Sequence, residues 1–174
     1  MKRNALLSAG AVVLLAIAGG SLVGCPGGNG GRVATVKQGE MPSGESWMGV
    51  YYHPVFGYLH MQENSSSVVG KWRREDQSAW GELSGTVTGN LVHFAWQEHK
   101  YGLVGPSADS KGKGYFVYKM GANNTPELDG QYGVGDDEVG GDWHNIKQTG
   151  KKPDLNSISG DMKGLAPNSG GKWE

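Results

Sequence analysis

Short segments of alternating apolar and polar residues follow one another along the middle of the chain, with turn residues about every ten positions. A period of two places successive side chains on opposite faces of a β-strand. The positions that share the expected buried faces are Trp47, Gly49 and Tyr51; Leu59 and Met61; Val68, Gly70 and Trp72; Leu83, Gly85 and Val87; Val92, Phe94 and Trp96; Phe116, Tyr118 and Met120; and Leu128, Gly130 and Tyr132. A weaker eighth strand is expected over residues 143–148. Regular short strands without helical periodicity predict an all-β sandwich or barrel.

A five-residue pattern, apolar-x-Gly-x-apolar, recurs in four of these expected strands, at residues 47–51, 68–72, 83–87 and 128–132. The strand period puts the central glycine on the same face as both large residues. A glycine inside a strand marks a sharp bend or a close approach of another chain segment, and closing a small barrel needs such bends. The pattern therefore favours a single small antiparallel up-and-down barrel of about eight strands.

Composition divides the chain into a barrel domain with flexible ends. Residues 47–150 hold the expected barrel, residues 25–46 form a Gly-rich N-terminal tether, and residues 151–174 form a polar C-terminal tail without apolar periodicity, which we expect to be disordered. A flexible tether of about 20 residues has an average reach of roughly 25 Å. It would hold the barrel away from whatever the N-terminus is attached to.

The first residues have the pattern of an export signal. Lys2 and Arg3 are followed by a mostly apolar run over residues 5–18, as in secretory signal peptides. The next motif, Leu22-Val23-Gly24-Cys25, resembles the lipobox of bacterial lipoproteins. That resemblance implies that residues 1–24 are a signal peptide, that the chain is cut before Cys25, and that the Cys25 thiol and the new amino terminus carry acyl chains.

Two other interpretations of the leader are a transmembrane anchor and an ordinary signal peptide. A spanning helix needs about 20 predominantly apolar residues, and the Gly-Gly-Ser sequence at residues 19–21 interrupts this run. The lipoprotein interpretation is favoured because Leu22 precedes the cysteine by three positions. Pro26 follows Cys25, and the absence of an aspartate there favours the outer membrane over the inner membrane as the site of anchoring.

The remaining composition limits the function. Cys25 is the only cysteine, so the domain has no disulfide. Without residues 1–24 the chain carries 14 basic and 17 acidic residues, a net charge of −3, which does not suggest nucleic-acid binding. The same part has 27 glycines in 150 residues, against a usual content of about 7%. Five Trp, seven Tyr and three Phe between Trp47 and Trp143 argue for a packed fold rather than a disordered one.

The strand pattern over residues 47–148 resembles small up-and-down barrels, the avidin-like barrel most, and lipocalin-like barrels in general build. The resemblance rests on a first strand containing a tryptophan, on the glycine-bent strands, and on a central strand over residues 91–96. It implies an interior filled by side chains or holding one small ligand. Biotin is not expected, because Gly49 stands where the avidin pattern has a polar Asn. The candidate ligand-lining residues are Trp72, Phe94, Trp96 and Tyr132, which we favour as core because a small domain needs a full core.

Motifs of known chemistry are absent from the sequence. It has no Gly-x-Ser-x-Gly elbow, HExxH motif or P-loop. The five histidines, His53, His60, His93, His99 and His144, are scattered without metal-ligand spacing. The acidic group at residues 136–138 does not match a calcium loop and is interpreted as a solvated hairpin loop. We expect no cofactor, no metal and no catalytic residue.

Three functions remain open at this point. The favoured one is a non-enzymatic, lipid-anchored protein of the bacterial cell envelope that binds a protein partner or supports an assembly at a membrane. The second is binding of a small apolar ligand inside the barrel. The third is inhibition of a periplasmic protease, because one inhibitor family also combines an eight-stranded barrel with an N-terminal arm. That family typically contains a disulfide, which this chain cannot form.

Overall fold

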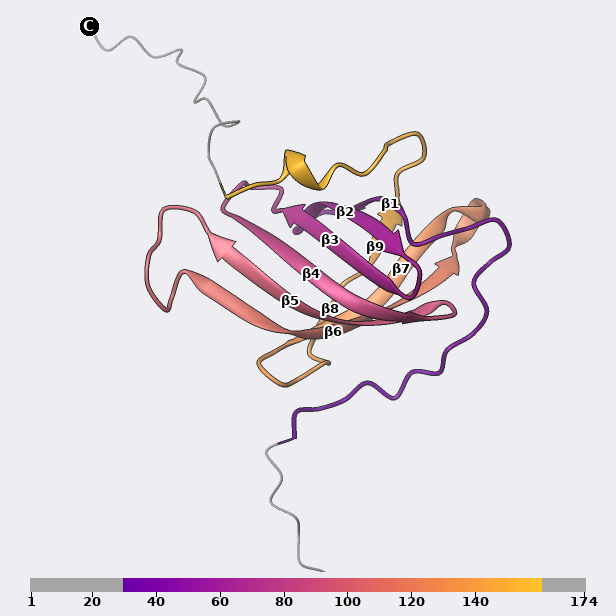
Figure 1. Cartoon of the computed structure of the whole chain (residues 1–174), viewed down its shortest axis with the longest axis horizontal. Helices are drawn as coiled ribbons and strands as arrows, with labels where there is room; N and C mark the ends of the chain where they lie inside the picture. The colour runs from indigo at the N-terminus through magenta and orange to yellow at the C-terminus, as the bar shows by residue number, and fades with distance from the viewer. Residues whose placement is uncertain (1–29, 161–174) are drawn as a thin grey trace, which may run out of the picture.

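Nine strands form between Gly49 and Lys147 in the computed structural model, which describes residues 30–160 (Figure 1). They are β1 (Gly49–His53), β2 (Gly57–Asn64), β3 (Ser67–Arg73), β4 (Ala79–Thr88), β5 (Leu91–Lys100), β6 (Asp109–Met120), β7 (Pro126–Val134), β8 (Gly141–Asp142) and β9 (Asn145–Lys147). Two short 3-10 turns, η1 (Ala122–Asn124) and η2 (Leu155–Ser157), complete the described structure. The expected signal peptide, Cys25, and the part of the expected tail after residue 160 lie outside it.

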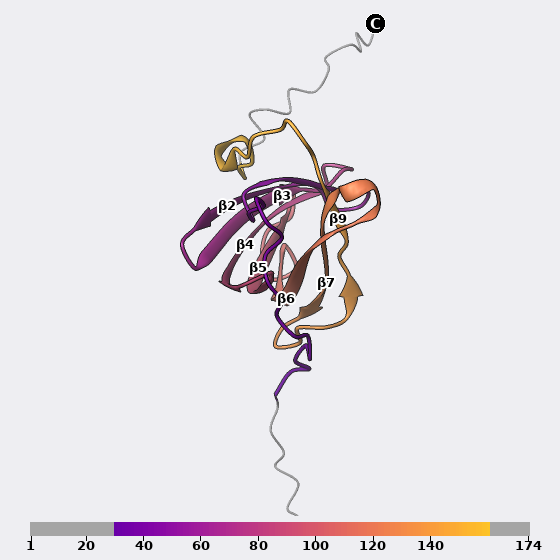
Figure 2. The same ribbon diagram turned by 90° about the vertical axis from the view of Figure 1, so that its right-hand side faces the viewer.

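The strands close into an eight-stranded antiparallel barrel. Consecutive strands pair from β1 to β7, and β9 closes the ring by pairing with both β7 and β1. The two-residue strand β8 pairs with β7 alone. Figure 2 shows β2 to β6 curving round one side, with β7 and β9 closing the other. The predicted fold, an all-β up-and-down barrel of about eight strands, is confirmed.

The barrel interior holds the residues that the alternation assigned to it. Trp47, Tyr51, Leu59, Met61, Val68, Trp72, Val92, Phe116, Tyr118 and Leu128 are almost completely buried in one hydrophobic cluster. Val87 and Met120 are only partly buried against it, at strand ends. The weak eighth strand is β9, and Trp143, just before it, is 1% exposed. Burial of these large rings is the main source of the barrel's stability.

Glycines allow neighbouring strands to approach at the bends. A Cβ built on Gly130 of β7 would lie 1.9 Å from the carbonyl oxygen of Tyr115 in β6, and one on Gly85 of β4 would lie 2.4 Å from the carbonyl oxygen of His93 in β5. Both obstacles are backbone atoms of the adjacent strand, so a side chain would push two strands apart. This close approach explains why two of the four patterned positions must be glycine.

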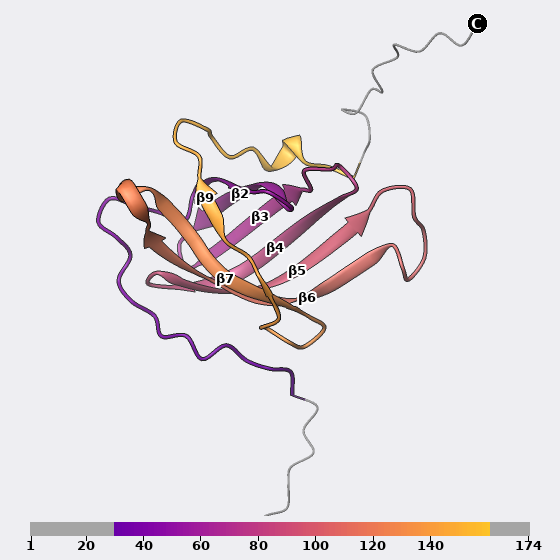
Figure 3. The ribbon, with the colours of Figure 1, turned by 180° about the vertical axis from the view of Figure 1, so that it is seen from behind.

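The described part of the predicted tether lies against the barrel. In this N-terminal strap (residues 31–46), Arg32 donates its backbone N–H to Asp137 Oδ1 at 2.8 Å, and its Nε and Nη2 donate to Asp137 Oδ2 at 3.1 and 2.8 Å. The backbone N–H of Ala34 donates to Glu138 Oε2 at 2.8 Å. Further along, the N–H of Gly39 donates to Asn90 Oδ1 at 2.6 Å. The strap therefore runs along the outside of the barrel, as Figure 3 shows from behind in indigo.

These contacts correct the interpretation of residues 136–138 as a solvated loop. Glu138 is only 7% exposed, and its carboxylate contacts the His93 ring as well as the strap. The hydrogen bonds from Arg32 hold the pKa of the Asp137 carboxyl below its ordinary value. The acidic turn is thus a docking site for the strap, and the sequence does not reveal it because Arg32 and Asp137 are 105 positions apart.

The chain after β9 also returns to the barrel. Asp154 donates its backbone N–H to His60 Nδ1 at 3.0 Å, and Tyr101 Oη donates to the carbonyl of Ser159 at 3.2 Å. Ile158 is 5% exposed. Contacts at Asp154, Ile158 and Ser159 therefore hold the first part of the expected tail against the barrel. Figure 1 shows this segment in yellow on the side of the barrel opposite the start of the strap.

Candidate binding surface

The four aromatic residues proposed to line a ligand site lie inside the barrel and pack on one another. Trp72 is 1% exposed, Phe94 4% and Trp96 8%. Trp143 occupies the space between them, with its ring centre 5.2 Å from that of Trp72, 5.8 Å from that of Phe94 and 5.9 Å from that of Tyr132. These edge-to-face distances are those of tightly packed aromatic cores. Trp72, Phe94 and Trp96 are therefore core, and the half-buried Tyr132 packs against them.

A cavity of about 30 Å³ remains at one end of the interior, bordered by Trp72, Arg74, Trp96 and Glu98 among others. The volume is about that occupied by a single water molecule in the liquid. Drug-sized ligands need sites of roughly 300–1,000 Å³. The interior of the described barrel is thus filled, which argues against the hypothesis of a ligand held inside it.

A buried ion pair borders this cavity. Arg74 donates Nε to Glu98 Oε2 at 2.8 Å and Nη2 to Glu98 Oε1 at 2.9 Å, and Trp72 Nε1 lies 3.3 Å from Oε2. The hydrogen bond to Glu98 raises the pKa of Arg74 above its ordinary value. Because both carboxylate oxygens are occupied by donors, Glu98 is placed to hold the end of the barrel together.

Sequence reasoning missed this pair, although a signal was present. Glu98 continues the inward-facing series of Val92, Phe94 and Trp96 at the strand period. A charge at an inward position is unusual unless it is paired. The alternation could have indicated a buried partner, but Arg74, on the turn after β3, could be found only from the fold.

A second cluster of titratable groups joins the end of the strap to the barrel. Tyr118 Oη donates to Glu45 Oε2 at 2.5 Å, and Lys147 Nζ donates to the same oxygen at 3.0 Å and to Tyr118 Oη at 2.9 Å. Burial and the Glu45 carboxylate raise the pKa of Tyr118. The hydrogen bond from Tyr118 lowers the pKa of Glu45. At neutral pH Tyr118 keeps its proton and Glu45 its charge, so the cluster is suited to bonding the strap rather than to proton transfer.

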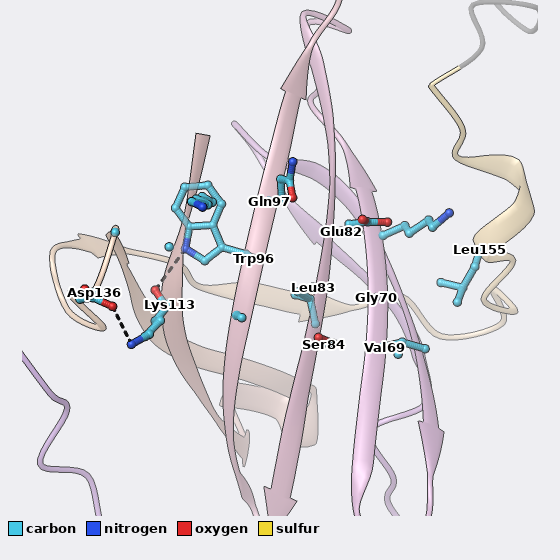
Figure 4. A pocket seen from close by; sticks show the side chains of 15 residues that line it. Val69, Gly70, Glu82, Leu83, Ser84, Trp96, Gln97, Lys113, Asp136 and Leu155 are labelled. Carbon is cyan, nitrogen blue, oxygen red and sulfur yellow. Dashed lines mark hydrogen bonds and ion pairs between the residues drawn. The ribbon is translucent and has the colours of Figure 1, made fainter. Parts of the chain in front are cut away.

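A groove of about 750 Å³ crosses the outer face of β3, β4, β5 and β6 (Figure 4). Register pairing lines up one outward-facing row across its floor, Val69, Ser84, Ala95 and Lys113. The side chains of Ser84 and Ala95 are small, so they project little from the sheet and leave a depression at the centre of this row. Leu155 of η2 borders the groove on one side and Asp136 of the turn after β7 on the other. The groove therefore forms where two chain segments rise beside a floor of small residues.

Charged side chains surround this floor. The adjacent outward row consists of Lys71, Glu82, Gln97 and Lys111, one from each of the four strands. At the edge near the strap, Lys113 Nζ donates to Asp136 Oδ1 at 3.0 Å. The groove thus combines a floor of small side chains with polar and charged groups beside it. The alternation places each of these residues on the outer face, but only the register shows that they lie side by side.

The side chains that could ligate a metal ion are dispersed in the described part of the chain. Residues 30–160 contain no group of three His, Cys, Asp or Glu side chains placed to hold a metal ion. In the same range no helix is long and apolar enough to span a membrane. His53 ends β1, His99 lies on β5 and His144 lies between β8 and β9. The charge of His144 contributes, after burial, to a lowered pKa of His53.

No protein-family model, curated protein or solved structure matches the chain. The resemblance to small up-and-down barrels therefore holds at the level of the barrel architecture, which the described residues display.

Proposed function

We propose that this protein is a lipid-anchored, non-enzymatic protein of the bacterial cell envelope that binds a protein partner through the groove on β3–β6. The observation that carries the proposal is the contrast between a filled interior, with about 30 Å³ left, and an outer groove of about 750 Å³. Binding to this barrel is therefore expected on its outside. The barrel would serve as a rigid support for the groove.

The attachment to a membrane comes from the lipobox-like motif that ends at Cys25, and Pro26 after it favours the outer membrane. Acylation by two or more chains gives stable anchoring, whereas one chain is marginal. The near-balanced charge of the chain favours a protein partner over nucleic acid. Of the alternatives, a ligand inside the barrel lacks space, and no observation favours protease inhibition.

The anchor is tested by intact-mass measurement and membrane fractionation. We expect the protein to carry acyl mass on Cys25 and to sediment with outer membranes, and a Cys25→Ala variant to lose both properties. Recovery of unmodified, soluble full-length protein would contradict the anchoring.

The groove is tested by site-specific photo-crosslinking in living cells. A crosslinking amino acid at Ala95, in the centre of the floor, is expected to capture one protein of constant mass. The matched control is Ile146 of β9, an outward position 42% exposed on the other side of the barrel. Ser84→Arg, which fills the floor beside Ala95, should abolish the Ala95 product. Equal capture from Ala95 and Ile146, or capture that survives Ser84→Arg, would reject the groove as the binding site.

A further inference from the structure

The strap is bonded to the barrel close to the expected lipid. Six residues, 26–31, separate Cys25 from Arg32, and Arg32 makes three hydrogen bonds to Asp137. The carbonyl of Arg32 also accepts the backbone N–H of Glu138 at 2.8 Å. A Cβ on Gly31 would lie 1.9 Å from the carbonyl oxygen of Asp136. The strap is therefore seated directly on the turn after β7.

The Arg32–Asp137 contact, which we call the latch, shortens the chain between the barrel and the expected lipid. A chain spans at most about 3.3–3.6 Å per residue, so seven steps from Cys25 to Arg32 reach at most about 25 Å. Together with the hydrogen bond from the Ala34 N–H to Glu138, the latch holds the chain to the barrel within nine steps of Cys25, whereas the next contact along the strap, Gly39 with Asn90, is 14 steps away. The point at which the chain leaves the barrel thus decides which side lies nearest the lipid.

The surface around that point has features of a membrane-contact surface. We call it the latch face. It consists of Val33 and Lys113, which border one surface depression together with Asp136, and of Val134, the last residue of β7 before the same turn. Val33 is 71% exposed and Val134 is 68% exposed. Lys113 is paired with Asp136 and Arg32 with Asp137, so these carboxylates add little uncompensated negative charge. Two exposed valines beside the long aliphatic stems of Lys113 and Arg32, with the charges paired, suit the boundary between the headgroups and water.

We propose that the latch face rests on the lipid surface and that the Arg32–Asp137 contact sets the orientation of the barrel on the membrane. The inference rests on the proposed acylation of Cys25. Asp136 then borders the groove on the membrane side, and Leu155 borders it on the far side. In this orientation the groove opens parallel to the membrane plane, towards a partner attached to the same membrane. The segment over residues 148–160 lies on the side of the barrel opposite the start of the strap (Figures 1 and 3), so in this orientation it would point away from the lipid.

The experiment uses the full acylated protein in vesicles of phosphatidylethanolamine and phosphatidylglycerol. Because the lipid occupies the Cys25 sulfur, one introduced cysteine is the only free thiol and can carry a fluorescent label. Labels at Val134→Cys, Val104→Cys and Asn156→Cys are compared for quenching by spin-labelled lipids. Val104 is a matched valine, 93% exposed on the loop between β5 and β6, and Asn156 lies on the far side. We expect several-fold stronger quenching at position 134 than at positions 104 and 156.

The latch is tested with two neighbouring carboxylates. Asp137→Ala removes the acceptor of Arg32 and should reduce quenching at position 134 towards the value at 156. Asp136→Ala, in the same turn, removes only the bond to Lys113 and should leave the difference between the sites unchanged. Equal quenching at the three sites, or no effect of Asp137→Ala, overturns the orientation while the acyl mass and vesicle flotation still support the anchor. Absence of acyl mass and of flotation overturns the anchor and the orientation together.

Discussion

Replacing each patterned glycine with alanine separates two roles that look identical in the sequence. Gly49, Gly70, Gly85 and Gly130 occupy the same place in the recurring five-residue pattern. Their surroundings differ. A Cβ on Gly130 or Gly85 meets a backbone carbonyl of the adjacent strand, whereas a Cβ on Gly70 meets Leu59 and Leu83 side chains and one on Gly49 meets the end of Lys147.

The size of each effect follows from these distances. Moving the Tyr115 carbonyl from 1.9 Å to the 3.0 Å below which real Cβ contacts are essentially absent requires β6 and β7 to separate by about 1.1 Å at Gly130. Overpacking of this kind costs typically 1–3 kcal/mol, occasionally more. Alanine restores about 0.4–1 kcal/mol by restricting the unfolded chain. We expect a net loss of about 1–2.5 kcal/mol for Gly130→Ala. At Gly49, where the Lys147 Cε at 2.9 Å can move aside, we expect a change near zero.

Urea unfolding followed by tryptophan fluorescence measures these differences. The expected order of destabilisation is Gly130→Ala, Gly85→Ala, Gly70→Ala and then Gly49→Ala. Gly30→Ala is the control, because a Cβ there meets nothing within 4 Å. If Gly130→Ala were no more destabilising than Gly49→Ala, the close approach of β6 and β7 would not limit the residue at position 130, and the reasoning would be refuted.

Further predictions concern charged groups. Arg74→Met leaves the buried Glu98 without its cation and should lower the free energy of unfolding by about 3 kcal/mol. Adding Glu98→Gln to Arg74→Met removes the unpaired charge and should restore part of that stability. If urea unfolding shows no such recovery, the loss does not come from the unpaired charge. Stability should also fall on acidification. Burial lowers the pKa of His53, so its contribution is complete above the ordinary value near 6.5 and is lost as the pH falls below it. The hydrogen bond from Tyr118 lowers the pKa of Glu45, so its contribution is lost as the pH falls through the lowered value; pH-dependent melting with Glu45→Gln should lack this second decrease.

The sequence predicted the strands well because the information is local. Alternation with period two depends only on neighbouring residues, and it assigned Trp72, Phe94 and Trp96 to the interior. The two ends of the domain were less predictable. The Gly-rich composition suggested a free tether, yet Arg32 docks on a turn 105 positions away, and Ile158 is buried in a stretch without apolar periodicity.

By itself the sequence determined the barrel class, the inward faces of the strands, and the expectation of an acylated Cys25, since each follows from a short motif or a periodicity along the chain. Only the tertiary structure decided that the interior is full, that Glu98 pairs with Arg74, and that Ser84 and Ala95 lie side by side on the floor of a groove. Those features depend on strand register, on the shapes of packed side chains, and on contacts between distant residues. A pattern along the chain reports only on neighbouring residues, so these features could be identified only from the fold.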